Sequence, residues 1–327
     1  MRSRARWARV RVRDRYRPAE RAASNSVRSA ARIRSILRDG RIELVHANEA
    51  HAVTAAWLAG TPQKVPFLIS RRVGYPLGQS WIAQKRYRAA SCIIANSQWV
   101  ADQAAASGAP KDKLRVAYEG VVIPGRTSPE LRMAARHRWG VAGDAPLLGC
   151  AGVLLPDKGQ EWLIRALVEV RKEFPGARLL LAGDGPMRKE LEALAKTLGL
   201  GEAVIFAGFV KDVESVYAAL DVFLLPSFFE ALNNSLLTAM AHAIPSIAFR
   251  RGALAEIIED GKSGLIVSGP EVQEICEAVA RILRDRDFAR RLGEAGRARV
   301  SKNFSADSMV ERIVEIYDEV LQGRPAV

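Results

Sequence analysis

One carboxylate stands in a segment whose pattern suits phosphate and sugar binding. An apolar strand is expected over 222–225, and it runs into a turn that carries Glu230. Small and amide residues follow, then a short helix over about 235–243 and a second strand over 246–249. In an open parallel sheet, ligands bind where strands end and helices begin, and the free N–H groups at a helix start favour phosphates. Glu230 could then hold sugar hydroxyls, although an ordinary βαβ turn with a solvated glutamate would share this local pattern.

Four segments, in the same order along the chain, match one family of enzymes. They read AGVLLPDKGQEWLIRAL, FPGARLLLAGDGPMRKELEALAKTLGL, VIFAGFVKDVESVYAALDVFLLPS and PSFFEALNNSLLTAMAHAIPSIAFRRGALAEIIEDGKSGLIV. The chain resembles the retaining glycosyltransferases of family 4 over roughly residues 42–321. The resemblance implies the GT-B fold, an α/β architecture in which two Rossmann-like parallel-sheet domains face a cleft. It also implies a hexosyltransferase-type activity that takes a nucleotide-diphosphate sugar as donor substrate and needs neither a metal nor another cofactor.

The resemblance assigns the charged part of a donor site to two residues. Sugar transfer leaves negative charge on the departing diphosphate, and a positive group held beside it is usually a large catalytic term. The family supplies an Arg and a Lys in the pattern G-R-L-x-x-x-K-G, and the stretch that begins at Gly152 has Lys158 but carries Val153 in place of the Arg. Of the family's two acids spaced Glu-x7-Glu, Glu230 matches the first, which contacts the donor sugar, and Thr238 replaces the second, which holds the ribose. Each departure removes a charged contact with the donor.

Further donor contacts are implied by the same motifs. Gly183 and Gly185 would permit close approach of the backbone to the donor, although a purely structural turn explains them equally well. Phe209 and Val210 stand where the family holds the base, and Phe209 could equally be a core residue. The residues that would present backbone N–H groups to the sugar and phosphates are Leu232, Asn233, Asn234 and Ser235.

The first half of the chain offers acceptor-side candidates. The stretch HANEAHA resembles a segment of the related glycogen and starch synthases, and on that register His51 matches the catalytic histidine that faces the reacting sugar. His46 ends a predicted strand, and either histidine could be purely structural. Arg71 and Arg72 end another predicted strand and could hold an anionic acceptor or be solvated surface residues. Because the family retains anomeric configuration by front-face attack, the resemblance gives Glu230 a binding role rather than that of a covalent nucleophile.

The positive charge of the chain is concentrated at its start. The 327 residues carry a formal net charge of +13. Residues 1–41 contain 14 Arg and only Asp14, Glu20 and Asp39 as acids, a net of +11, so the remainder carries about +2. This basic arm could bind an anionic membrane surface, could bind nucleic acid without sequence specificity, or could reflect a start position that differs from the natural one. Residues 1–22 cannot bury much apolar surface, so they are expected to be poorly ordered or at most an isolated helix.

Composition also indicates a cellular compartment. No run of about 18 apolar residues exists, and the start lacks the apolar stretch of a secretory signal. Cys92, Cys150 and Cys276 lie far apart in apolar or helical surroundings, which favours buried thiols in a reducing cytoplasm. Neither the cysteines nor the four histidines have metal-ligand spacing. We therefore expect a cytoplasmic protein, in one interpretation peripheral on the inner face of the cytoplasmic membrane.

Alternating strand and helix patterns predict a parallel α/β sheet in each half of the chain. Four units are expected: an arm over 1–22, an acceptor-side domain over 23–139, a nucleotide-sugar-binding domain over 140–305, and a last stretch over 306–327 whose helix crosses back to the first domain. No glycine precedes Gly40, where family members have a glycine-rich loop, so the first domain is expected to be incomplete. The predicted strands lie at 42–47, 65–70, 92–95, 147–152, 179–182, 204–207, 222–225, 246–249 and 265–267.

The leading interpretation is a retaining glycosyltransferase that moves a sugar to a cell-envelope glycan or lipid-linked acceptor, as in lipopolysaccharide biosynthesis. The acceptor class rests on the stretch ISRRVGYP, which resembles that of bacterial envelope transferases. The alternative is a degenerate GT-B protein that binds a nucleotide or glycan without turnover, because Val153 and Thr238 depart from the motifs. A nucleic-acid-binding protein with a basic arm is a more remote alternative.

Overall fold

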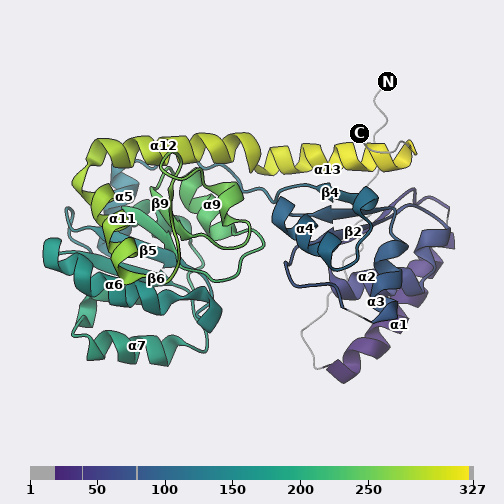
Figure 1. Ribbon diagram of the computed structural model, residues 1–327, viewed down its shortest axis with the longest axis horizontal. Coiled ribbons are helices and arrows are strands. Elements are labelled where there is room, and N and C mark those ends of the chain that lie inside the picture. Colours follow the sequence, from purple (N-terminus) through teal and green to yellow (C-terminus); the bar gives the residue numbers. More distant parts are fainter. Residues whose placement is uncertain (1–18, 39, 79, 324–327) are drawn as a thin grey trace.

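The computed structural model describes residues 19–38, 40–78 and 80–323. They form two α/β lobes, with a long helical segment at the end of the chain running along both (Figure 1). The stretch predicted to be poorly ordered falls mostly on residues 1–18, which lie outside the described residues. Residues 19–22 begin the first helix, α1 (Ala19–Arg38). None of the helices in the described ranges is long and apolar enough to cross a membrane.

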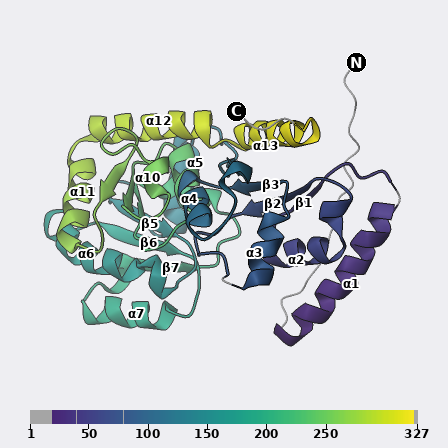
Figure 2. The ribbon, with the colours of Figure 1, turned by 45° about the vertical axis from the view of Figure 1, so that its right-hand side comes forward.

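The smaller sheet has four parallel strands in the order β1-β2-β3-β4. The strands are β1 (Val45–Ala47), β2 (Phe67–Arg71), β3 (Cys92–Ala95) and β4 (Leu114–Val116). Leu68, Ile69 and Ile93 are buried, as expected of a parallel sheet covered on both faces. The connecting helices are α2 (Ala50–Leu58), α3 (Trp81–Arg88) and α4 (Gln98–Ala106). Helix α1 packs against α2 at the outer end of this lobe (Figure 2).

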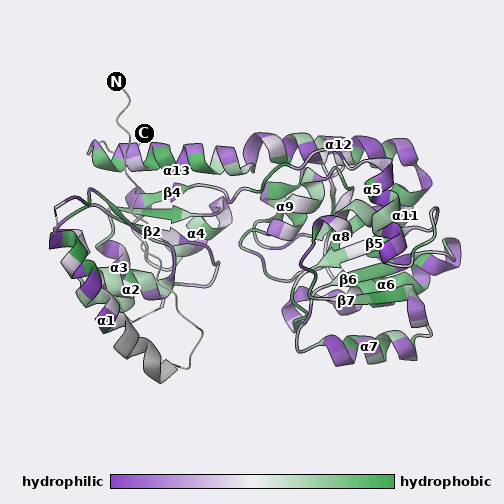
Figure 3. Ribbon diagram, turned by 180° about the vertical axis from the view of Figure 1, so that it is seen from behind, coloured by the Kyte–Doolittle hydropathy of each residue, from purple (hydrophilic) through white to green (hydrophobic). Residues whose placement is uncertain are grey.

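The larger sheet has six parallel strands in the order β10-β9-β8-β5-β6-β7. They are β5 (Leu147–Ala151), β6 (Arg178–Ala182), β7 (Val204–Gly208), β8 (Val222–Leu225), β9 (Ser246–Phe249) and β10 (Leu265–Val267). The chain proceeds outward in one direction from β5 and in the other from β8, so the strand order reverses between these two neighbours. Hydrophobic residues predominate in the strands, whereas the outer helices carry both hydrophilic and hydrophobic residues (Figure 3).

The helices around the larger sheet are α5 (Pro129–Arg138), α6 (Gln160–Glu173), α7 (Arg188–Thr197), α8 (Glu214–Ala219), α9 (Asn234–Ala241), α10 (Leu254–Ile257) and α11 (Val272–Arg284). Short 3₁₀-helices occur at Thr61–Gln63, Lys111–Lys113, Pro156–Lys158 and Gly201–Ala203.

Two consecutive helices link the lobes. They are α12 (Arg286–Asn303) and α13 (Ala306–Leu321). The chain bends between them, where Val121 N donates to Phe304 O and Ala306 N donates to Val121 O, both at 2.9 Å. Helix α12 packs on α9 of the larger lobe, whereas α13 lies along the smaller sheet with Ile316 buried against it (Figure 1). The helix that ends the described chain therefore covers the lobe that begins it.

The predicted fold class, an α/β protein with two parallel sheets, is confirmed. The strand predicted over 42–47 is limited to β1, and β4 was not predicted. The predicted boundary after residue 139 assigns helix α5 to the smaller lobe. In the structure, α5 packs on α8 of the larger lobe.

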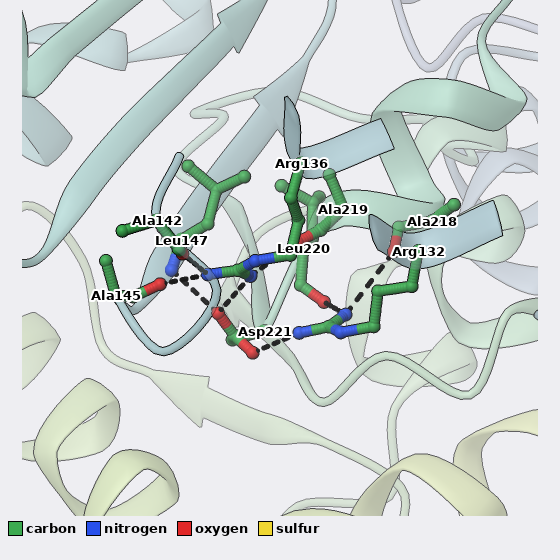
Figure 4. Close-up of polar contacts among 9 residues, drawn as sticks. All are labelled: Arg132, Arg136, Ala142, Ala145, Leu147, Ala218, Ala219, Leu220 and Asp221. Atoms are coloured by element: carbon green, nitrogen blue, oxygen red, sulfur yellow. Dashed lines mark hydrogen bonds and ion pairs between the residues drawn. The ribbon is translucent and has the colours of Figure 1, made fainter. Parts of the chain in front are cut away.

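The buried side chain of Arg136 explains why the division after residue 139 separated α5 from its lobe (Figure 4). Residues 136–144 carry charged side chains together with Gly140 and Gly143, a composition typical of a domain boundary, yet the side chain of Arg136 is only 4% exposed. Its guanidinium donates to Asp221 Oδ2 at 3.1 Å and to Ala219 O at 3.0 Å. Arg132, one turn earlier, donates to the other oxygen of Asp221 at 2.5 Å. The charge is compensated by groups that lie far away in sequence, so local polarity did not reveal its burial.

Candidate active site

The strongest candidate for a ligand site lies where the strand order of the larger sheet reverses. Ligands of open parallel sheets bind at the carboxyl ends of the strands beside such a reversal. Two loops leave the sheet there, 152–159 after β5 and 226–233 after β8, and the two strands are hydrogen-bonded neighbours. The loops are joined through the backbone, since Phe228 N donates to Asp157 O at 2.9 Å. We refer to residues 226–233 as the donor loop.

Lys158 and Glu230 meet between these loops. Lys158 Nζ donates to Glu230 Oε1 at 2.8 Å. The two residues that the resemblance assigns to the donor site are therefore in direct contact. Glu230 is only 7% exposed, and a buried carboxylate is stable only with a charged or hydrogen-bonding partner. The pair offers a cation for a phosphate group and an anionic acceptor for hydroxyl groups.

A glycine next to Lys158 allows the loop after β5 to approach the donor loop. Gly159 has a φ of +66°, in the left-handed region that favours glycine. A Cβ at this position would stand 2.3 Å from Pro226 O. A larger residue would therefore push the two loops, and with them Lys158 and Glu230, apart.

Gly183 and Gly185 pack against the loop after β5. A Cβ on Gly183 would stand 1.9 Å from Gly152 O, and one on Gly185 would stand 2.4 Å from Leu154 O. The backbone is paired along this contact, with Gly152 N donating to Ala182 O at 2.9 Å. Both glycines thus have a structural role, which is to let one loop lie directly on the other.

The donor loop ends at the start of α9. Asn233 caps this helix, with Oδ1 accepting from Leu236 N at 2.8 Å. Asn234 is exposed and Ser235 is half-buried, whereas Leu232 is buried in the core of the larger lobe. The first N–H groups of a helix lack partners within the helix, so this backbone supplies donors beside Glu230.

The two departures from the family motifs keep uncharged side chains at the site. Val153 is apolar and 52% exposed. Thr238 lies in α9, where its hydroxyl donates to Asn234 O at 2.7 Å. The Thr238 hydroxyl also lies against the Tyr217 phenol, whose pKa burial raises to about 12. Neither position therefore supplies a charge that could replace the missing Arg or Glu.

The residues expected near the base have different exposures. Phe209 follows β7 and is 85% exposed, so the alternative hypothesis that it belongs to the core is wrong. Val210 is partly buried against the core of the larger lobe. An exposed phenyl ring at the carboxyl end of a strand is available to stack on a planar ligand.

His46 belongs to a hydrogen-bonded chain at the end of β1. His46 Nδ1 lies 2.7 Å from Tyr317 Oη of α13, and His46 Nε2 lies 2.8 Å from Ser70 Oγ. Ser70 Oγ donates to Asn48 Oδ1 at 2.8 Å, so Ser70 must accept the proton of Nε2, and Nδ1 must accept from Tyr317. The chain connects the last helix to the segment that leads into α2. Sequence reasoning missed Tyr317, because 271 residues separate it from His46.

We expect His46 to contribute to a loss of stability at acidic pH. Burial lowers the pKa of His46 from 6.5 to about 4 in the folded protein. The unfolded chain therefore takes up the proton first, so the contribution is intact above pH 6.5 and is lost as the pH falls toward 4. Thermal unfolding of His46→Gln between neutral and acidic pH should show a shallower pH dependence than that of the unchanged protein. The exposed His137, replaced by Gln, is the control, and equal slopes for His46→Gln and the unchanged protein would contradict the prediction.

The other acceptor-side candidates are less enclosed. His51 lies in the first turn of α2 and is exposed. Arg71 Nη1 donates to Tyr87 Oη at 3.2 Å, and its Nη2 donates to Tyr75 O, so it supports the loop after β2. Arg72 pairs with Glu119, which raises the pKa of the guanidinium. An anionic ligand at Arg72 would have to compete with this carboxylate.

Two protein-family models match the chain. The model described as Glycosyltransferase Family 4 matches residues 2–123, and the model described as Glycosyl transferases group 1 matches residues 145–285. The first match includes all four strands of the smaller sheet. The second includes both loops of the candidate site together with Lys158 and Glu230.

Two relatives illustrate the sequence similarity. A GDP-mannose-dependent alpha-(1-6)-phosphatidylinositol monomannoside mannosyltransferase of Mycolicibacterium smegmatis is 34% identical over 207 residues, which are 61% of this chain and 54% of the relative. The chain thus spans about half the length of that relative. The lipopolysaccharide core biosynthesis glycosyltransferase LpsE of Rhizobium meliloti is 29% identical over 296 residues, covering 89% of this chain and 81% of the relative.

Solved structures share the architecture. Anabaena HepE, crystallised in complex with UDP and glucose, superposes with a TM-score of 0.78 at 26% identity, over 88% of this chain and 80% of HepE. A glycosyltransferase of Rickettsia africae gives a TM-score of 0.82 at 21% identity, over 94% of this chain and 84% of that protein, a likeness of fold alone.

Proposed function

Because the chain belongs to glycosyltransferase family 4 and has the GT-B fold, we propose that it transfers a hexose from a nucleotide-diphosphate sugar to a glycan or lipid-linked acceptor. The observation that carries the proposal is the Lys158–Glu230 pair at the strand reversal of the larger sheet. The backbone donors at the start of α9 lie directly after Glu230 along the chain. A cation, a carboxylate and helix-end N–H groups are the groups that a diphosphate and a sugar ring require.

The pair is arranged to exchange partners when the donor enters. Lys158 would leave Glu230 for the diphosphate, and the carboxylate of Glu230 would accept hydrogen bonds from the hydroxyl groups of the sugar. The exchange keeps both charges compensated, which matters because Glu230 is buried. As the bond to the sugar breaks, the charge that develops on the diphosphate faces Lys158 and the positive end of α9.

The acceptor and the stereochemistry form the finer part of the proposal. The similar proteins carry names that refer to a phosphatidylinositol mannoside and to the lipopolysaccharide core, which supports an acceptor in the cell envelope. We propose that transfer retains the anomeric configuration, with Glu230 binding the donor rather than attacking it. On the acceptor side we propose His51 beside the reacting sugar, and Arg71 and Arg72 toward an anionic group.

A second candidate function is binding without turnover. The observation that favours it is the loss of charge at two donor positions, where Val153 and Thr238 stand. The hydroxyl of Thr238 donates a hydrogen bond to the carbonyl of Asn234 in its own helix. A GT-B protein of this kind would bind a nucleotide or glycan with reduced affinity.

Restoring the two charges tests whether this site binds a nucleotide-diphosphate donor. The double substitution Val153→Arg and Thr238→Glu should tighten the binding of a nucleoside diphosphate by at least about tenfold, since a hydrogen bond to a charged group contributes roughly 1.5–3 kcal/mol. Calorimetric titration with UDP, GDP and ADP measures the change. The unchanged protein should bind at least one of them.

The control for this titration is Val213→Arg, which adds the same charge at a valine of similar exposure in the same lobe. An equal gain in nucleotide affinity for Val213→Arg and for the double variant would indicate general attraction of an anion. A double variant with no gain for any nucleotide would count against donor binding at this site.

A further inference from the structure

The donor loop contacts the opposite lobe through the residue before Glu230. Phe229 stacks on Tyr75, with ring centroids 4.7 Å apart and planes inclined by 17°. Phe229 also meets Trp99 edge-to-face, at 5.3 Å and 74°. Tyr75 follows β2 and Trp99 lies in the first turn of α4, so both rings belong to the smaller lobe. Stacked and edge-to-face geometries are the attractive ones for aromatic pairs.

The residue after Glu230 also contacts the smaller lobe. Ala231 packs against a cluster of that lobe formed by Ala95, Val100 and Ala101. Glu230 itself is held on its own lobe, because Ala253 N donates to Glu230 O at 3.1 Å. Glu230 therefore stands between two residues whose side chains touch the opposite lobe.

A second contact between the lobes ends on the same tryptophan. Glu256 of α10 accepts from Gln98 N at 2.8 Å and from Trp99 N at 2.7 Å. Tyr118 Oη donates to the same carboxylate at 2.9 Å. The carboxylate thus occupies the N-terminus of α4, where negative charge is stabilised. On its own lobe, Arg299 Nη2 donates to Glu256 O at 2.8 Å.

We propose that Phe229, Trp99 and Glu256 are positioning residues for sugar transfer. Trp99 joins the two contacts, because its backbone N–H holds Glu256 and its ring holds Phe229. The lobes and the donor loop are therefore ordered together, and docking of the smaller lobe fixes the residues on both sides of Glu230. The proposal rests on the proposed function, in which Glu230 contacts the donor sugar. Sequence reasoning missed Glu256, whose signal was a single charge within the apolar stretch ALAEII.

The distance between the lobes gives the first test and needs no knowledge of the donor. Spin labels are attached at Arg88→Cys in the smaller lobe and Lys211→Cys in the larger lobe, both at exposed positions. The background is Cys276→Ser, since the other two cysteines are buried. Pulsed electron paramagnetic resonance should show one narrow distribution of distances between the two labels for this protein.

The same measurement is made on variants of the contact. Phe229→Leu and Glu256→Gln should each add a longer distance, because one link between the lobes is lost. Glu259→Gln is the matched control, since Glu259 pairs with Arg299 within the larger lobe. Distributions that stay narrow in both contact variants would overturn the proposal.

Nucleotide affinity gives the second test. Calorimetry compares UDP with UDP-glucose, and GDP with GDP-mannose. The contact variants should lose about tenfold in affinity for the nucleotide sugar and less than about twofold for the diphosphate alone, and Phe229→Tyr should retain the affinity of the unchanged protein. Equal losses for sugar nucleotide and diphosphate would overturn the positioning role. If the unchanged protein bound no nucleotide, the proposed function would fail, and the distance measurement would still decide whether these residues hold the lobes.

Discussion

Replacing Lys158 by alanine is expected to lower the rate of sugar transfer by about 10²–10³-fold. That is the typical cost of removing one preorganised group that stabilises charge in a transition state. Lys158 is the cationic side chain that contacts Glu230. The motif position that holds an Arg in the family is occupied by Val153, so the motif supplies no second cation. The rate should be measured with the nucleotide sugar that binds best, at saturating donor, so that weaker binding does not account for the loss.

The same substitution also leaves Glu230 buried without its ionic partner, which lowers stability as well as activity. The double variant Lys158→Ala, Glu230→Gln removes the unpaired charge, so its unfolding temperature should recover while its activity stays low. Lys172→Ala is the control, because Lys172 pairs with Glu169 on the exposed surface of α6. Full activity in Lys158→Ala would contradict the donor-site assignment.

Replacing Asp221 by alanine is expected to destabilise the larger lobe by about 3 kcal/mol, the lower part of the range for breaking a buried ion pair. Asp221 accepts from Arg132 and Arg136, and its Oδ2 also accepts from Leu147 N at 2.7 Å (Figure 4). Without it, the guanidinium of Arg136 remains buried with carbonyl partners alone. In a lobe of this size the loss corresponds to a fall in unfolding temperature of roughly 6–12 °C.

An exposed ion pair made by another arginine of α5 is the control for this loss of stability. Asp212 pairs with Arg138 at 3.0 Å, and both side chains are about half exposed. Asp212→Asn should cost less than about 1 kcal/mol, as surface pairs do. Differential scanning calorimetry of both variants measures the difference, and similar unfolding temperatures would show that the burial of Arg136 carries no energetic consequence.

Part of this protein could be derived from its sequence alone. The alternation of apolar strands and amphipathic helices predicted two parallel sheets, because each pattern repeats within a few residues and records which face is buried. The resemblance to the family motifs, rather than periodicity, assigned the loops after β5 and β8 to a common donor site. Lys158 and Glu230 each follow one of these strands directly, so the sheet brings them together to 2.8 Å.

The tertiary structure decided what the local patterns left open. Arg136 lies in a stretch whose composition is typical of a domain boundary, but a carboxylate 85 residues later allows its side chain to be buried. Phe209 could have been a core residue, and only its exposure excludes this. Gly183 and Gly185 show their packing role only beside the loop that they touch.

The contacts between the lobes had no signal in any short window of sequence. Phe229 looks like one more apolar residue before a helix, and Trp99 looks like a helix residue of another domain. Their pairing depends on how the lobes dock, as does the link between His46 and Tyr317 of the last helix. Periodicity and motifs report the local environment of a residue, whereas these partners are selected by the arrangement of whole lobes, which brings together segments that are far apart in the chain.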